Sequence, residues 1–366
     1  GTIAITGSRA VTMDADSLLE TGSGAISVTS GAQMTLDVVE SLNNGPITLT
    51  TTAGGIIEAA DPSRIGALGS TSLLTIVSAG GVGASGTGAL DTDVGTLVLS
   101  AAGDVYISEA TALQLGSGAG PVTSSAGSIT ITAAGALTTG NDVTTTGGNG
   151  SVSLAGAGVT VGHDVTAQGT GTILIDGGGG NVDLSAGTLS TSSASATAVV
   201  VRNAANALLG DISASSGTVV LGQAGDMITG TVTQALATSV LAGVLTAETG
   251  GAIVLNRDNG VVSLGTVRRG GSFTLNNSPG GLTVTGPVTG GTITNDVTIS
   301  AAGNLTVSGP VSTSGAGTTL SLSGQSVALG ANLSAGGGTV RLHASADGIS
   351  QTAGAITAGG LAVTGV

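Results

Sequence analysis

Apolar and polar residues alternate in short runs that return along the whole chain. Each run opens with Gly, often followed by Thr or Ser, and then alternates apolar and polar positions. The copies read GTIAIT, GAISVT, GPITLT, GTLVLS, GSITIT, GSVSLA, GTILID, GTVVLG, GAIVLN, GSFTLN and GTVRL. Alternation with a period of two residues is typical of β-strands that bury one face. The first apolar residues of successive copies lie 20 to 34 residues apart, about 24 on average, and recurrence at that period indicates a solenoid.

Further short strands are predicted within each repeat. Apolar alternations follow small-residue corners at 105–107, 143–144 and 305–307. The corners are rich in Gly, Asn and Asp, which adopt positive φ at low cost. Three strands and their corners within about two dozen residues predict one turn of a three-sided coil. We therefore expect an all-β protein, a parallel β-helix or β-solenoid of about fifteen coils.

The alternation also predicts a register between neighbouring coils. Residues two apart on a strand share a face, and burial turns the apolar face inward. We expect aligned inward stacks on successive coils. The residues in these stacks are Ile129, Ile131, Val152, Leu154, Ile173 and Ile175.

The repeat runs through the whole chain, so we predict a single continuous β-helix over residues 1–366. The three longest intervals between copies predict irregular coils or loops near 57–72, 108–126 and 229–250. Both termini fall inside the repeat, and neither GTIAIT nor GGLAVTGV resembles a cap. Uncapped coils expose unpaired strand edges. We therefore expect a segment of a longer protein, with possible end-to-end self-association.

Composition narrows the function classes. The net charge is −14 and the seven basic residues are all Arg, which argues against nucleic-acid partners and anionic membrane surfaces. Glycine contributes 67 residues without a Gly-X-Y period, which excludes collagen. There is no Cys, which excludes disulfides and thiolate chemistry. No apolar run is long enough to span a bilayer, so no membrane span is expected.

The repeats resemble a known family. Runs such as GSITITAAGALTTGNDV (127–143), VTISAAGNLTVSGPVSTSGAG (297–317) and GTLVLSAAGDVYI (95–107) look like those of filamentous-haemagglutinin-type adhesins of Gram-negative two-partner secretion. The resemblance covers essentially the whole chain. It implies a right-handed parallel β-helix that is secreted or held at the cell surface, outside the Gram-negative outer membrane. It also implies a role in adhesion, biofilm or cell contact. The family's Asn-Pro-Asn-Gly secretion motif is missing, since 277–280 reads Asn-Ser-Pro-Gly.

Several acidic and histidine residues are candidates for chemistry. Asp14 and Asp16, like Asp91 and Asp93, lie two residues apart, so each pair of carboxylates shares one strand face and is able to hold an ion. The alternative is that all four are solvated corner residues. The two histidines, in His163-Asp164 and at His343, lack a Gly-x-Ser-x-Gly elbow, and surface positions explain both.

Three other motifs have a plain structural interpretation. Residues 177–180 are four glycines that form a turn rather than a phosphate loop, since no Lys and no helix follow. Arg268-Arg269 is either an anchor for an acidic partner or a charged turn that protects a strand edge. Thr-x-Thr at 48–50, 130–132 and 283–285 suggests an ice-binding array, but the residues vary too much between coils.

Two functional hypotheses follow. The preferred one is a structural shaft of a secreted or cell-surface adhesin, or of an extracellular filament. It needs no catalytic residue, cofactor or metal, and other parts of the protein would contact host or neighbouring receptors or glycans. The alternative is a β-helical polysaccharide lyase or glycosidase, which requires clustered carboxylates. Only two aromatic residues, Tyr106 and Phe273, are available as sugar platforms.

Overall fold

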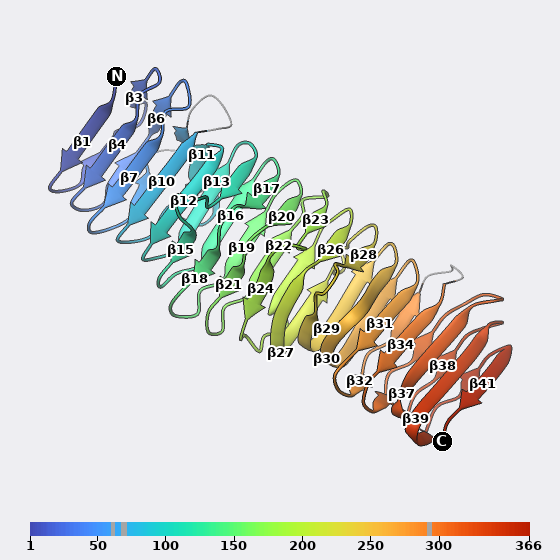
Figure 1. The fold of residues 1–366 in the computed structure, drawn as a ribbon. Helices are drawn as coiled ribbons and strands as arrows, with labels where there is room; N and C mark the ends of the chain where they lie inside the picture. The colour runs from blue at the N-terminus through green and yellow to red at the C-terminus, as the bar shows by residue number, and fades with distance from the viewer. Residues whose placement is uncertain (60–62, 67–71, 291–294) are drawn as a thin grey trace. The chain divides into compact units, whose positions relative to one another are not determined.

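The computed structural model describes residues 1–59, 63–66, 72–290 and 295–366. Nearly all its regular structure is short β-strand, and its strand pairs are parallel. Among the described residues the one helical element is a 3₁₀ turn at Gly86–Gly88, and none forms a helix long and apolar enough to cross a membrane. Stacked parallel coils make up the fold, so the predicted β-solenoid class is confirmed (Figure 1).

The chain separates into two compact units. Unit 1 comprises residues 1–180 and 186–193, and unit 2 comprises residues 181–185 and 194–366. Whether they form the single continuous helix expected over 1–366 stays a prediction.

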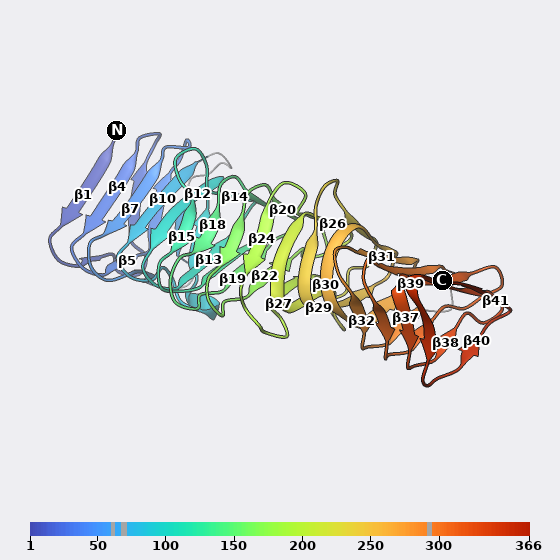
Figure 2. The same cartoon turned by 60° about the horizontal axis from the view of Figure 1, so that its bottom comes forward.

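Unit 1 contains long ladders of parallel strands. The first ladder runs through β1 (Ile3–Gly7), β4 (Ile26–Ser30), β7 (Ile47–Thr51), β10 (Leu73–Ser78), β12 (Thr96–Ala101), β15 (Val122–Ser124), β18 (Val143–Thr145), β21 (Val165–Ala167) and β24 (Thr188–Thr191). Its first four strands lie side by side in both views (Figures 1 and 2). The second contains β2 (Val11–Thr12), β5 (Met34–Leu36), β8 (Ile56–Glu58), β13 (Val105–Glu109), β16 (Ile129–Ala133), β19 (Val152–Ala155) and β22 (Ile173–Asp176), with Val82 bridging β8 and β13.

The third side of unit 1 is made in two parts. One part contains β3 (Leu18–Thr21), β6 (Val38–Ser41), β9 (Arg64–Gly66) and β11 (Leu90–Asp93). The other contains β14 (Leu113–Leu115), β17 (Leu137–Thr139) and β20 (Val159–Val161). Three strands per coil is the pattern expected of a three-sided solenoid.

Unit 2 repeats this plan with longer strands that turn corners without a break. β27 (Asp211–Leu221), β29 (Val240–Thr249), β30 (Ile253–Arg269), β37 (Thr319–Leu329) and β39 (Thr339–Gln351) each serve more than one ladder. The shorter strands between them are β23 (Val182–Asp183), β25 (Val199–Arg202), β26 (Ala207–Leu209), β28 (Val232–Gln234), β31 (Phe273–Asn277), β32 (Leu282–Val284), β33 (Val288–Gly290), β34 (Val297–Ala301), β35 (Leu305–Val307), β36 (Val311–Ser312), β38 (Leu333–Ser334), β40 (Ile356–Thr357) and β41 (Gly360–Thr364).

The predicted inward stack is confirmed. Ile129 pairs with Val152, which pairs with Ile173, while Ile131, Leu154 and Ile175 form the matching stack two residues on. All six are at most 1% exposed. Burying such a side chain contributes about 1.5–3 kcal/mol, so repetition over many coils builds a large core from narrow layers.

At least one long interval in the repeat arises because successive copies lie in different ladders. Leu97 pairs with Leu74 in the first ladder, whereas Ile129 pairs with Val105 in the second, so this interval spans a coil and a change of side. The segment 108–126 holds β14 and β15, and 229–250 holds β28 and β29. Both segments thus contain paired strands, and the register of β29 against β27 and β30 shifts, so irregular coils at 108–126 and 229–250 stay a prediction. Near 57–72, residues 60–62 and 67–71 lie outside the described residues, and β9 lies between them.

Candidate functional site

Several acidic residues lie at corners, where they connect one coil to the next. Asp104 Oδ1 accepts the backbone N–H of Ser128 at 2.7 Å. Asp164 Oδ1 accepts that of Thr188 at 2.9 Å. Asp296, in unit 2, does the same for Thr319, at 2.7 Å. Each carboxylate thus satisfies a donor that lies 23 or 24 residues further along, at the start of a strand of the next coil. The spacing of about one acid per coil therefore has a structural cause.

The predicted aspartate pairs do not gather other ligands. Asp14 and Asp16 lie in an exposed turn, where Asp16 has a positive φ of 65°. Asp91 and Asp93 lie on β11, and Glu58 Oε1 accepts the N–H of Asp91 at 2.6 Å. Among the described residues, no group of three or more His, Cys, Asp or Glu side chains is placed to hold a metal ion.

A groove borders this region. It has a volume of about 460 Å³ and is lined by Val38, Ser63, Arg64, Asp91, Thr92, Ser108 and Ala110. Arg64 forms an ion pair with the buried carboxylate of Glu40. Asp91 is the one acid among these lining residues, whereas a glycosidase or lyase needs at least two opposed carboxylates.

Glu109 is a buried carboxylate that the motif search did not find. It ends β13 and is 2% exposed. Its Oε2 accepts the hydroxyl of Thr92 at 2.8 Å and the N–H of Val94 at 3.0 Å, and its Oε1 accepts the N–H and hydroxyl of Thr111 at 2.9 and 2.8 Å. Burial raises the pKa of Glu109 above its ordinary value of 4.5, although these four hydrogen bonds oppose the shift. The available signal was alternation: in Val-Tyr-Ile-Ser-Glu the acid occupies an inward position.

Both histidines have structural surroundings. The backbone N–H of His163 donates to Thr139 Oγ1 at 3.0 Å, and its carbonyl accepts from the same hydroxyl at 3.3 Å. In unit 2, His343 Nδ1 lies 3.0 Å from Thr364 Oγ1 on the neighbouring β41. No carboxylate is hydrogen-bonded to either ring among the described contacts, so neither shows the geometry of a nucleophile–base–acid relay.

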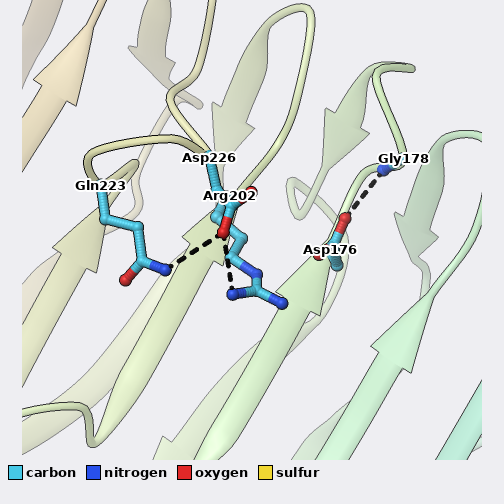
Figure 3. Close-up of polar contacts among 5 residues, drawn as sticks. All are labelled: Asp176, Gly178, Arg202, Gln223 and Asp226. Carbon is cyan, nitrogen blue, oxygen red and sulfur yellow. Dashed lines mark hydrogen bonds and ion pairs between the residues drawn. The ribbon is translucent and has the colours of Figure 1, made fainter.

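The glycine run at 177–180 is a turn. Gly178 and Gly179 have positive φ, and the N–H of Gly178 donates to Asp176 Oδ1 at 3.0 Å (Figure 3). Gly180 N–H donates to the carbonyl of Gly177, which closes the turn.

The threonines of the Thr-x-Thr motifs have partners that differ from coil to coil. Thr48 lies between Ser27 and Thr75, and Thr130 lies between Tyr106 and Ser153.

The two consecutive arginines of β30 point opposite ways. The side chain of Arg268 is 63% exposed and its Nη1 lies 3.9 Å from Glu248 Oε2. Arg269 is 4% exposed, donates to the carbonyls of Gly271 and Ser312, and keeps a buried Nε without a hydrogen-bond partner. Burial lowers the pKa of Arg269, and the charge of Asp296 opposes this shift. Arg269 thus links coils inside the wall, and Arg268 remains at the surface.

Unit 2 also has a ladder of buried amides, formed by Gln234, Asn259 and Asn277, which are at most 6% exposed. Gln234 Nε2 donates to Asn259 Oδ1 at 2.8 Å, and Asn259 Nδ2 donates to the carbonyl of Asn276 at 3.0 Å. Asn277 Oδ1 accepts the N–H of Val261 at 2.7 Å. The hydrogen-bonding groups of these side chains hold the corners and are not directed at a substrate.

Taken together, the described polar groups form separate structural contacts rather than one reactive cluster. Comparisons of the chain with models of protein families, with curated proteins and with solved structures found no match.

Proposed function

We propose that this chain is a structural shaft of a secreted or cell-surface adhesin, or of an extracellular filament, on the outer side of a Gram-negative outer membrane. Regions outside these residues would contact receptors or glycans on host or neighbouring cells. The chain itself has a mechanical role: it holds a binding region away from the cell and bears force. It catalyses no reaction.

One observation supports this proposal above the others, namely the regular stacking within each unit. Inward residues such as Ile129, Val152 and Ile173 meet the equivalent residue of the next coil, and each is at most 1% exposed. Each coil therefore depends on its neighbours, and every strand pair adds backbone hydrogen bonds between coils. Such a stack resists bending, and its length can change by whole coils.

If the length of the stack can change by whole coils, deleting one coil from the full-length protein tests the proposal directly. Removing residues 129–151 takes out one coil, since Val152 can then pair with Val105 in place of Ile129. We expect the deletion to keep the β-rich circular dichroism spectrum and to leave receptor binding unchanged. A matched deletion of residues 129–140 removes half a coil and should abolish folding, because strands of different sides are brought into register.

Two results would contradict the shaft. One is loss of receptor binding on removal of a single well-folded coil, because this would place the binding site within the stack. The other is cleavage of an acidic polysaccharide such as polygalacturonate by the purified 366-residue chain, which would support the carbohydrate-active enzyme instead.

A further inference from the structure

A groove in unit 2 runs beside Arg268. It has a volume of about 260 Å³ and is lined by Val220, Gly222, Gln223, Ala224, Thr246, Ala247, Glu248, Thr266 and Arg268. A second hollow of about 320 Å³ shares Glu248 and Arg268 and reaches Met227 and Thr289. The shared residues place the Glu248–Arg268 pair where the two hollows meet, and small or apolar side chains line the first hollow.

One wall of the groove is fixed in place. Gln223 and Asp226 bridge the turn at 222–226 through two backbone hydrogen bonds, and Gly222 and Gly225 adopt positive φ. Arg202 Nη1 donates to Asp226 Oδ2 at 3.1 Å, and Gln223 Nε2 donates to the same oxygen at 3.3 Å (Figure 3). The turn is therefore organised before any ligand arrives, which lowers the entropic cost of binding.

The charge of the groove differs from that of the chain. Overall the chain carries −14, whereas Arg268 and Arg269 line these two hollows and balance the acids beside them, Glu248 and Asp296. Asp226 is neutralised by Arg202. Arg268 is 63% exposed, lies 3.9 Å from Glu248, and donates no hydrogen bond to any described residue. A guanidinium with unused donors favours a carboxylate that binds it through two parallel hydrogen bonds.

We propose that this groove binds an acidic peptide segment, with a carboxylate on Arg268 and small apolar side chains over Val220 and Ala247. The groove residues include no aromatic ring, the usual platform for a sugar, so a peptide fits better than a polysaccharide. Glu248 competes with the ligand for Arg268. This proposal is independent of the shaft function, because it concerns a surface contact and not the stack.

The test uses the 366-residue chain and the probe peptide Ac-Glu-Val-Glu-Val-Glu-NH₂, followed by calorimetry or NMR titration at low salt. We expect Arg268→Gln to weaken binding at least about tenfold and Glu248→Gln to strengthen it about threefold. Arg341→Gln is the matched control, because Arg341 is an exposed arginine of β39 in the same unit, and it should leave affinity unchanged. Added NaCl should weaken wild-type binding.

The opposite signs at positions 268 and 248 separate a specific site from general charge attraction. Equal weakening by Arg268→Gln and Arg341→Gln would overturn the site, as would an absence of binding at millimolar peptide. Replacing every Glu of the probe with Gln should abolish binding. Polygalacturonate that binds through Arg268 while the peptide does not would also overturn the proposed peptide ligand. Unchanged circular dichroism spectra would show that each variant is folded.

Discussion

The hydroxyl corners of unit 1 and the amide corners of unit 2 are held by different numbers of hydrogen bonds. In unit 1, Ser30, Thr51 and Ser78 end consecutive strands of the first ladder. Each hydroxyl donates to a carbonyl three residues on, as Thr51 does to Gly54 at 2.9 Å. In unit 2, the amides of Gln234, Asn259 and Asn277 occupy such corners. Both kinds of side chain also reach a neighbouring coil, since Thr51 Oγ1 accepts the N–H of Ala79 at 3.1 Å and Gln234 Nε2 donates to Asn259 Oδ1 at 2.8 Å. The amides differ in the number of groups that one side chain can hold at once.

The difference follows from reach and from the number of hydrogen-bonding groups. A hydroxyl has one donor on a short side chain, which suits a tight corner. An amide has two donors and an acceptor further from the backbone. At Asn259 the register of β30 shifts between Leu255 and Asn259, and residues 256–258 bulge outward. The amide fills the gap by accepting the N–H of Val240 at 2.9 Å and donating to the carbonyl of Arg257 at 2.9 Å. An irregular corner is thus tolerated where a side chain replaces the missing backbone pairs.

The largest effect is expected at Asn259. Asn259→Ala removes an amide that is 0% exposed, takes one hydrogen bond from Gln234 and leaves the N–H of Val240 and the carbonyls of Arg257 and Asn276 without this partner. Unpaired buried polar groups cost about 1–3 kcal/mol each, so we expect a loss of about 3–5 kcal/mol in the free energy of unfolding. Urea unfolding monitored by circular dichroism measures it. A loss below about 1 kcal/mol would show that the ladder does not hold the coils.

A smaller effect is expected at the hydroxyl corner. Thr51→Val keeps the shape and removes the donor to Gly54 and the acceptor for the N–H of Ala79. We expect a loss of about 1–2 kcal/mol from these bonds and the contact with Ser78 Oγ, because the N–H of Ala79 keeps the backbone carbonyl of Thr51 as an acceptor. Thr51→Ser is the matched control and should stay within about 0.5 kcal/mol of wild type. If Thr51→Val destabilised as much as Asn259→Ala, the number of partners held by each side chain would not explain the difference between the two corners.

Glu109 offers a third kind of corner, in which a buried carboxylate takes the place of hydroxyl or amide. Because the pKa of Glu109 is raised in the folded state, its protonated form is favoured there. Its contribution to stability is therefore greatest at pH 4.5 and below, and declines as pH rises from 4.5 through the raised pKa. Glu109→Gln cannot titrate, so its stability relative to wild type should improve over that window, as thermal melts at several pH values would show. A constant difference between the two proteins would contradict this account.

The smallest effect is expected from metal removal. Both corner types take their partners from the chain itself, and no cluster of three metal-binding side chains occurs among the described residues. We expect EDTA to change the melting temperature by less than about 1 °C, within the scatter of small surface effects. A drop of several degrees, reversed by Ca²⁺ and absent from Asp91→Asn, would instead assign an ion to the pair at Asp91 and Asp93.

Prediction from the sequence succeeded where one local rule decides the outcome. The alternation at Ile129 and Ile131 was enough to place both side chains inward and to pair them with Val152 and Leu154. The same rule marks Glu109 as inward, but a motif search for clustered acids passes over a single buried one. Asn259 carried no such signal, because it lies just after the bulge at 256–258, where the alternation is interrupted.

What the sequence determined by itself is the strand, its inward face and the repeat that stacks it, since these depend on the backbone period and on burial alone. Which ladder a strand joins was decided only by the tertiary structure. The strands of a coil share one local pattern, so Leu97 and Ile129 look alike in sequence although they lie in different ladders. The tertiary structure also decided which groups form hydrogen bonds with the polar side chains. Many lie 24 or 25 residues away on the next coil, and no local pattern specifies them.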